Sequence, residues 1–184
     1  ADGSRALTIT YVAQVLNTAA NVQGLALINS STYSYTGSLP VNVSSVTVGV
    51  VESSSTLTLS LSTTTANLDA GTIITATVTV TSVAGRPVMY DSNIVMTLPS
   101  FLTYVNASTL KISGPDIPEP TVGGNTLTWG RSQAQDIDIS TTSQFRVQLL
   151  VGDSAEPQQP LNVNLRHDWT SLDGSPGPDL GTAV

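Results

Sequence analysis

The residues best suited to chemistry are acidic side chains near the end of the sequence. The stretch 168–179 contains Asp168, Asp173 and Asp179, together with hydroxyl side chains and two glycines. Carboxylates, hydroxyls and loop carbonyls are the oxygen ligands that calcium takes, roughly six to eight at a time. The spacing of an EF-hand loop is absent, so the alternative is a plain Asp-Gly turn followed by a Pro/Gly-rich linker. We predict these three aspartates as calcium candidates.

A second pair of carboxylates, Asp136 and Asp138, flanks Ile137. In a strand both carboxylates would lie on one face, where like charges are unfavourable unless water or a cation surrounds them. The favoured interpretation is a pair of solvated acids. A glycosidase pair would need aromatic platforms for the sugar, and aromatic residues make up only 5% of the chain.

The single histidine, His167, is predicted to be a partly buried structural residue. It continues an alternation of apolar residues and precedes Trp169, which would share its face. Asp168 cannot orient it as in a Ser-His-Asp triad, because adjacent strand residues point to opposite faces. No Gly-x-Ser-x-Gly motif presents a nucleophile. The sequence therefore predicts a protein that is not an enzyme.

The composition excludes several function classes. The 184 residues carry a net charge of −7 with six Lys and Arg, too few for binding to a nucleic-acid backbone. The absence of cysteine excludes disulfides, thiolate metal sites and cysteine nucleophiles. No apolar run in this segment is long enough to span a membrane. An acidic, Ser/Thr/Val-rich and nearly Lys-free chain is typical of extracellular β modules, so we expect a location on the cell surface.

Alternation of apolar and polar residues runs through almost the whole chain. This period of two is the pattern of half-buried antiparallel strands, and turn residues punctuate it every ten to fifteen positions or so. At Ser44 and Ser45 the alternation changes phase, which predicts a bulge. The pattern predicts an all-β antiparallel sandwich with strands at 5–16, 24–36, 40–50, 55–62, 72–83, 88–97, 107–113, 125–129, 143–152 and 160–170.

Part of the sequence is repeated. Residues 11–27 and 146–163 both read as a strand, a polar connection and the start of a second strand, at an offset of about 135 positions. We therefore predict that residues 1–51 are the C-terminal strands of a preceding sandwich module, or docking strands. Residues 52–184 would be a second module that ends in a Pro/Gly-rich linker.

Four segments resemble a known family of surface repeats. They are 57–62 (Leu-Thr-Leu-Ser-Leu-Ser), 69–80 (Asp-Ala-Gly-Thr-Ile-Ile-Thr-Ala-Thr-Val-Thr-Val), 89–99 (Met-Tyr-Asp-Ser-Asn-Ile-Val-Met-Thr-Leu-Pro) and 101–105 (Phe-Leu-Thr-Tyr-Val). They are similar to the DUF11 conserved repeat domain of large bacterial and archaeal cell-surface proteins. Met96 departs from the family pattern, which often has an acid there. The resemblance implies an Ig-like sandwich repeated in tandem, and its pattern adds Asp91 to the calcium candidates. Glu52, at the predicted module junction, is a secondary one.

The function predicted from these observations is structural. The chain would be an extracellular repeat module that serves as a spacer or fibre building block of a cell-surface adhesin or filament. Its partners would be neighbouring modules of the same protein, or identical subunits that complete its sheets with their strands; docking of 1–51 onto 52–184 is the third possibility. The alternative is a binding module for glycans or another surface partner, for which Tyr33 and Tyr35 form the only close aromatic pair.

Overall fold

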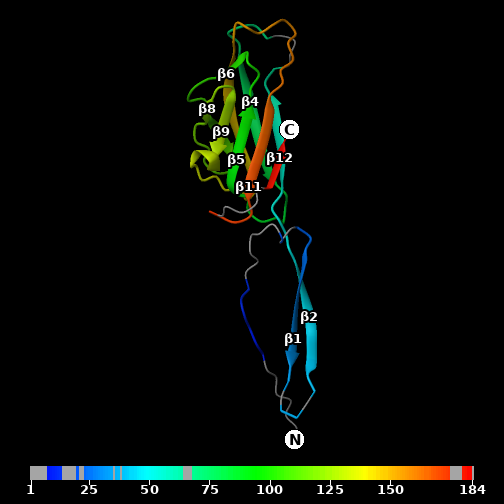
Figure 1. Ribbon diagram of the computed structural model, residues 1–184. Helices are drawn as coiled ribbons and strands as arrows, with labels where there is room; N and C mark the ends of the chain where they lie inside the picture. The colour runs from blue at the N-terminus through cyan, green and yellow to red at the C-terminus, as the bar shows by residue number, and fades with distance from the viewer. Residues whose placement is uncertain are drawn as a thin grey trace. The chain divides into compact units, whose positions relative to one another are not determined.

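The computed structural model of the protein describes residues 8–13, 20, 23–34, 36–37, 39–63, 68–174 and 180–183. The chain divides into two compact units, Ala1–Val50 and Val51–Val184. Figure 1 shows the strands that make up each unit. The described residues form strands, turns and one short 3-10 turn, η2 (Arg131–Gln133). Among these residues, no helix is long and apolar enough to cross a membrane.

The second unit is a sandwich of two antiparallel sheets. The strand order is β3-β4-β10-β6 in one sheet, with β7 also paired to β10, and β12-β11-β5-β9-β8 in the other. The orders β3-β4-β10 and β12-β11-β5 match strands A-B-E and G-F-C of immunoglobulin domains. The predicted all-β, Ig-like antiparallel sandwich is confirmed. The strands are β3 (Ser55–Leu61), β4 (Ile73–Ser82), β5 (Tyr90–Thr97), β6 (Leu102–Tyr104), β7 (Leu110–Ser113), β8 (Thr121–Gly123), β9 (Thr126–Gly130), β10 (Thr142–Val151), β11 (Asn164–Thr170) and β12 (Leu180–Ala183).

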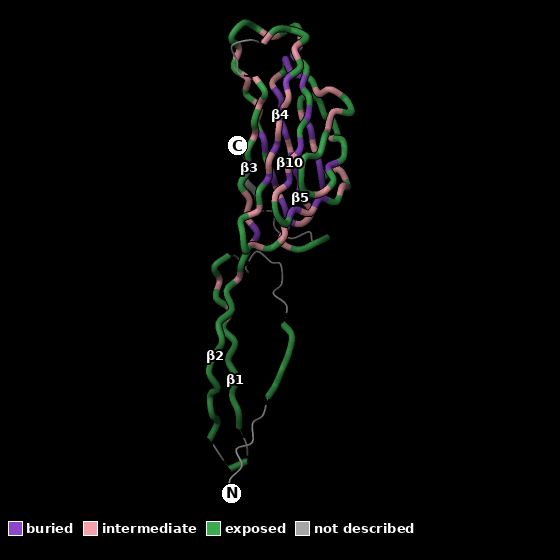
Figure 2. The backbone as a smooth tube through the Cα atoms, turned by 180° about the vertical axis from the view of Figure 1, so that it is seen from behind, coloured by how far each residue is buried: buried purple, intermediate pink, exposed green. Residues whose placement is uncertain are grey.

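Alternation places one face of each central strand in the core. Along β4 and β10 every second side chain is buried, and Val78 lies directly opposite Phe145. The rings of Trp129 and Phe145 meet edge to face with centroids 5.1 Å apart, which joins the two sheets. Figure 2 shows the buried positions along β4, β5 and β10. The residues predicted to be buried are all fully buried: Val78, Val80, Ile94, Trp129, Val147 and Leu149.

Three short strands lie where the sequence predicts none. β6 and β8 are three residues each, and β12 occupies part of the predicted Pro/Gly-rich linker. The linker prediction is therefore wrong for Leu180–Ala183, because these residues pair with β11 and extend its sheet. The rest of that segment, 175–179, lies outside the described residues.

The first unit contains a two-stranded antiparallel ribbon. Its strands are β1 (Ala26–Tyr33) and β2 (Val41–Gly49). The register shifts between Asn29 and Ser31, opposite the two serines where the alternation of the sequence changes phase. The described part of the predicted strand 5–16, residues 8–13, does not form a strand.

Candidate functional site

An acidic cluster forms where three segments of the sandwich meet. Asp91 lies in β5, Asp136 precedes the start of β10, and Asp173 lies in the turn after β11. One carboxylate oxygen from each lies within 4.8 Å of the others. Asp138 joins them, since its carboxylate accepts a hydrogen bond of 3.1 Å from the Asp91 N–H. The cluster thus places three carboxylates within reach of one another, and carboxylate oxygens are among the ligands that calcium takes.

Backbone pairing explains why these carboxylates converge. The side chains of Ile137 and Ile139 are buried, and Met89 and Ile139 exchange backbone hydrogen bonds of 2.9 Å. Since neighbouring residues point to opposite sides, burial of the isoleucines turns Asp136 and Asp138 outward. Asp91 also accepts a hydrogen bond of 2.8 Å from the Gly174 N–H, which fixes the Asp-Gly turn.

The pKa of Asp138 is shifted by its burial and by the neighbouring carboxylates. Burial raises its pKa above the usual value for an aspartate, and the nearby carboxylates of Asp136, Asp173 and Asp91 raise it further. The hydrogen bond from the Asp91 N–H acts in the opposite direction. A cation among these oxygens would relieve the repulsion between the carboxylates, which adds to the effect of burial on the pKa of Asp138.

The predicted calcium residues have different surroundings. Asp91 and Asp173 lie in the cluster, together with Asp136 and Asp138, which the sequence predicts to be only solvated. Asp168 lies in β11, where its carboxylate is 3.0 Å from the Arg166 guanidinium. Asp179 lies outside the described residues. Glu52 is half-buried at the start of the second unit.

His167 lies inside the sandwich and not at a surface. Its ring is fully buried and stacks on Trp169 with centroids 4.8 Å apart. Nδ1 lies 3.2 Å from the hydroxyl oxygen of Ser55, whereas Nε2 forms no hydrogen bond with any residue that the structure describes. The His167 ring therefore packs within the core, beside the half-buried Ser55. His167 is more deeply buried than the sequence predicts.

Acid should destabilise the sandwich through this histidine. Burial lowers the pKa of His167 from its usual 6.5 to about 4. Between these values the unfolded chain binds a proton that the folded chain does not, so the free energy of unfolding falls as the pH falls through this window. The full effect is about 3 kcal/mol. Urea unfolding at several pH values should show that the free energy of unfolding falls more steeply with falling pH in the wild type than in His167→Gln. The same pH dependence in both proteins would contradict this prediction.

A second candidate site is the exposed apolar face of the ribbon. We call it the valine face. Its four valines alternate along β2, and the register shift keeps them on one side; each is between 50% and 62% exposed. The opposite face is more polar, and there the Thr32 hydroxyl donates a hydrogen bond of 3.2 Å to Asn42. The valine face consists of Leu27, Tyr33, Val41, Val43, Val46 and Val48.

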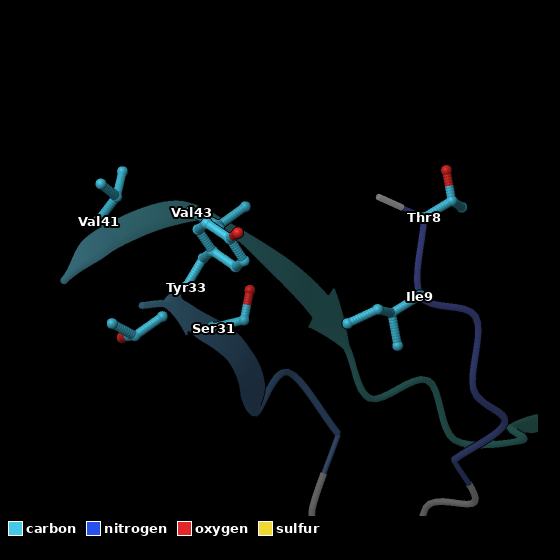
Figure 3. Close-up of a pocket in the computed structure, with 7 residues that line it drawn as sticks. Thr8, Ile9, Ser31, Tyr33, Val41 and Val43 are labelled. Carbon is cyan, nitrogen blue, oxygen red and sulfur yellow. The ribbon is translucent and has the colours of Figure 1, made fainter. Parts of the chain in front are cut away.

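One end of the valine face is hollowed into an open pocket of about 670 Å³. Figure 3 shows that Tyr33 and Val43 come from the ribbon, while Ile9 approaches from the segment before it. Ser31, Thr8 and Thr32 add hydroxyl-bearing side chains to a lining that is otherwise apolar or aromatic. Figure 2 shows β1 and β2 as largely exposed along their length.

The comparisons with known proteins find similarity only among solved structures. No protein-family model matches the chain, and no curated protein matches it. A membrane-anchored protein from Corynebacterium diphtheriae is similar at 8% identity with a TM-score of 0.49, over 85% of this chain and 49% of that one. The major pilin subunit BcpA of Bacillus cereus is similar at 9% identity with a TM-score of 0.45, over 84% and 45%. The chain thus spans less than half the length of either protein.

A third similar structure is the chitin-binding domain of a chitinase from Pyrococcus furiosus. The identity is 15% and the TM-score 0.33, over 61% of this chain and 92% of that domain. The resemblance of residues 57–105 to the DUF11 repeat stays a prediction.

Proposed function

We propose that the chain is a structural module of an extracellular protein, acting as a spacer or building block in a cell-surface adhesin or filament. The observation that carries the proposal is the valine face. A two-stranded ribbon is marginally stable in water, and exposed apolar surface costs about 25 cal/mol per Å². A surface that exposes four alternating valines gains stability when another polypeptide covers it. We therefore propose that neighbouring modules or subunits are its partners.

The sandwich supports a structural role in a different way. Its central side chains fill the space between the sheets, and its histidine is used for packing. The predicted resemblance to DUF11 surface repeats points to the same role. A spacer needs a stable, closed module of this kind.

The alternative function is a binding module for glycans. Tyr33 is half-exposed and lines the pocket together with the hydroxyls of Ser31 and Thr8, a combination that suits a sugar ring. Tyr35, its predicted companion, lies outside the described residues. The two functions differ in what the valine face contacts.

A glycan-array screen of wild type and Tyr33→Ala separates the two functions. The structural proposal expects no glycan bound by the wild type above the signal of the variant. A glycan that the wild type binds at micromolar concentration and Tyr33→Ala does not would overturn the proposal and favour the binding module. Melting curves of both proteins ensure that a difference in binding is not a difference in folding.

We also propose that calcium occupies the acidic cluster and stiffens the module. Extracellular calcium sites are weak, with dissociation constants of about 0.1–1 mM, so 5 mM calcium should add about 1–2 kcal/mol to the free energy of unfolding. The melting temperature should be a few degrees higher in calcium than in EDTA. Asp136→Asn should abolish this difference and Asp168→Asn, outside the cluster, should retain it. Equal melting temperatures of the wild type in calcium and EDTA would contradict the proposal.

A further inference from the structure

The ribbon of the first unit repeats the pairing of the last two strands of the second. Trp169 of β11 lies opposite Leu180 of β12. Tyr33 of β1 lies opposite Val41 of β2 in the same antiparallel arrangement. In both hairpins the aromatic residue is at the end of the first strand. The separation of Tyr33 and Trp169 agrees with the internal repeat, whose offset is about 135 positions.

This correspondence identifies the valine face as a core-facing surface. Three side chains of β11 are buried in the core of the sandwich: Leu165, His167 and Trp169. Their counterparts in β1 are Asn29, Ser31 and Tyr33, which lie on the side of the valine face. The side of the sheet that is covered in the second unit is thus exposed in the first.

The same correspondence distinguishes the two edges of the ribbon. In the second unit β12 is the edge strand, while β11 pairs with β12 on one side and with β5 on the other. Among the described residues, β1 pairs only with β2. The edge of β1 that faces away from β2 therefore corresponds to the edge of β11 that β5 covers. The outer edge of β2 corresponds to the outer edge of the sheet.

We propose that the edge of β1 that faces away from β2, which pairs with no strand among the described residues, accepts a strand of the β5 type from another sandwich module. This inference rests on the proposed structural function and specifies its partner. The strand runs antiparallel to β1 and adds backbone hydrogen bonds along it. In the second unit His167 lies opposite Ile94, so Ser31 lies opposite the residue of the incoming strand that corresponds to Ile94.

The second unit of another copy cannot supply this strand. Its β5 is paired on both edges, with β9 on one side and β11 on the other. The donor is therefore a module whose β5-type strand still has one unpaired edge, because it lacks a β11-type strand of its own. Its strand carries apolar side chains at alternate positions, as β5 does with Ile94 and Met96, both fully buried. Such side chains continue the valine face across the new strand.

Disulfide trapping tests this arrangement. The 184-residue chain has no cysteine, so Ser31→Cys introduces a single thiol into it. The probe is a synthetic peptide of residues 88–99 that carries Ile94→Cys. Directly opposite residues of antiparallel strands are close enough for a disulfide. The matched control is Val43→Cys, which lies beside Ser31 but on β2.

We expect the peptide to trap Ser31→Cys at least about tenfold faster than Val43→Cys in a glutathione redox buffer. A peptide that also carries Met96→Lys should lose this advantage, because a charge would replace an apolar side chain on the covered face. Equal or faster trapping at Val43→Cys would overturn the choice of edge. Equal trapping of both peptides would overturn strand addition.

A third outcome concerns the identity of the partner. If Ser31→Cys forms a symmetric disulfide dimer without peptide faster than it traps the peptide, a second copy covers the edge and the donor assignment is overturned. The structural function itself fails in the glycan screen, which does not depend on trapping. The two failures are therefore distinguishable.

Discussion

Gly130→Ala should strongly destabilise or unfold the sandwich. Gly130 ends β9 and lies opposite Asn93 of β5. Its φ is 106°, a backbone conformation that residues other than glycine rarely adopt. A Cβ atom at this position would lie 1.8 Å from the carbonyl oxygen of Ser92. That oxygen belongs to the backbone of a central strand and cannot move away without separating β5 from β9. We expect a loss of about 4 kcal/mol or more in the free energy of unfolding.

The matched control for this substitution is Gly123→Ala. Gly123 lies in β8 of the same sheet, and a Cβ atom there would have no neighbour within 4 Å. Far-ultraviolet circular dichroism and urea unfolding should show a nearly unchanged control and an unfolded or strongly destabilised Gly130→Ala. A Gly130→Ala protein with the midpoint of the control would show that β5 and β9 are not packed as described.

Trp129→Ala should also cause a large loss in the free energy of unfolding. Trp129 is fully buried and contacts Phe145 of the opposite sheet, so its removal leaves a large cavity where the two sheets meet. Truncation of a buried tryptophan to alanine costs about 3–5 kcal/mol. Chemical denaturation monitored by circular dichroism measures this loss, because it does not rely on the fluorescence of the residue removed.

Substitution by phenylalanine separates packing from hydrogen bonding at the two tryptophans. Nε1 of Trp129 makes no hydrogen bond with a described residue, whereas Nε1 of Trp169 donates one of 2.7 Å to the Ser53 hydroxyl. Trp129→Phe should therefore lose packing only, and Trp169→Phe should lose packing and leave Ser53 unpaired. We expect Trp169→Phe to be the more destabilising by about 1 kcal/mol. The reverse order would contradict this account of the core.

Much of the sandwich could be predicted from local alternation. The segments 72–83 and 143–152 agree with β4 and β10 to within one residue at each end, because both strands bury every second side chain. β6 and β8 are too short to show a period of two. β12 follows a Pro/Gly-rich stretch, and its strand conformation depends on pairing with β11, which no local pattern reveals.

The acidic cluster shows a limit of the same kind. The sequence predicts Asp91 and Asp173 as calcium candidates but interprets Asp136 and Asp138 as solvated. Their convergence depends on the pairing of residues far apart in the chain, including the bridge between Met89 and Ile139. The available signal in the sequence was the alternation of Asp136 and Asp138 with two isoleucines, whose burial in the structure turns the acids outward. The spacing of residues within one segment does not predict which distant segments the strand pairing brings together.

The valine face depends on both local and long-range features. The four valines of 41–48 and the phase change at Ser44 are visible in the sequence. That β1 and β2 pair so as to keep all four on one side is visible only in the register. The correspondence with β11 and β12 then distinguishes a covered edge from an outer one.

Hydrogen exchange of the isolated 184-residue chain, resolved by mass spectrometry, tests the central claim most directly. The claim is that the ribbon of the first unit gains stability from a further strand along β1, whereas the two sheets of the second unit cover each other. We predict that amides of β1 exchange within about seconds to minutes while those of β4 and β10 stay protected for hours or longer. Equal protection of β1 and β4 in a monomeric chain would show that the ribbon is already covered and would contradict the claim.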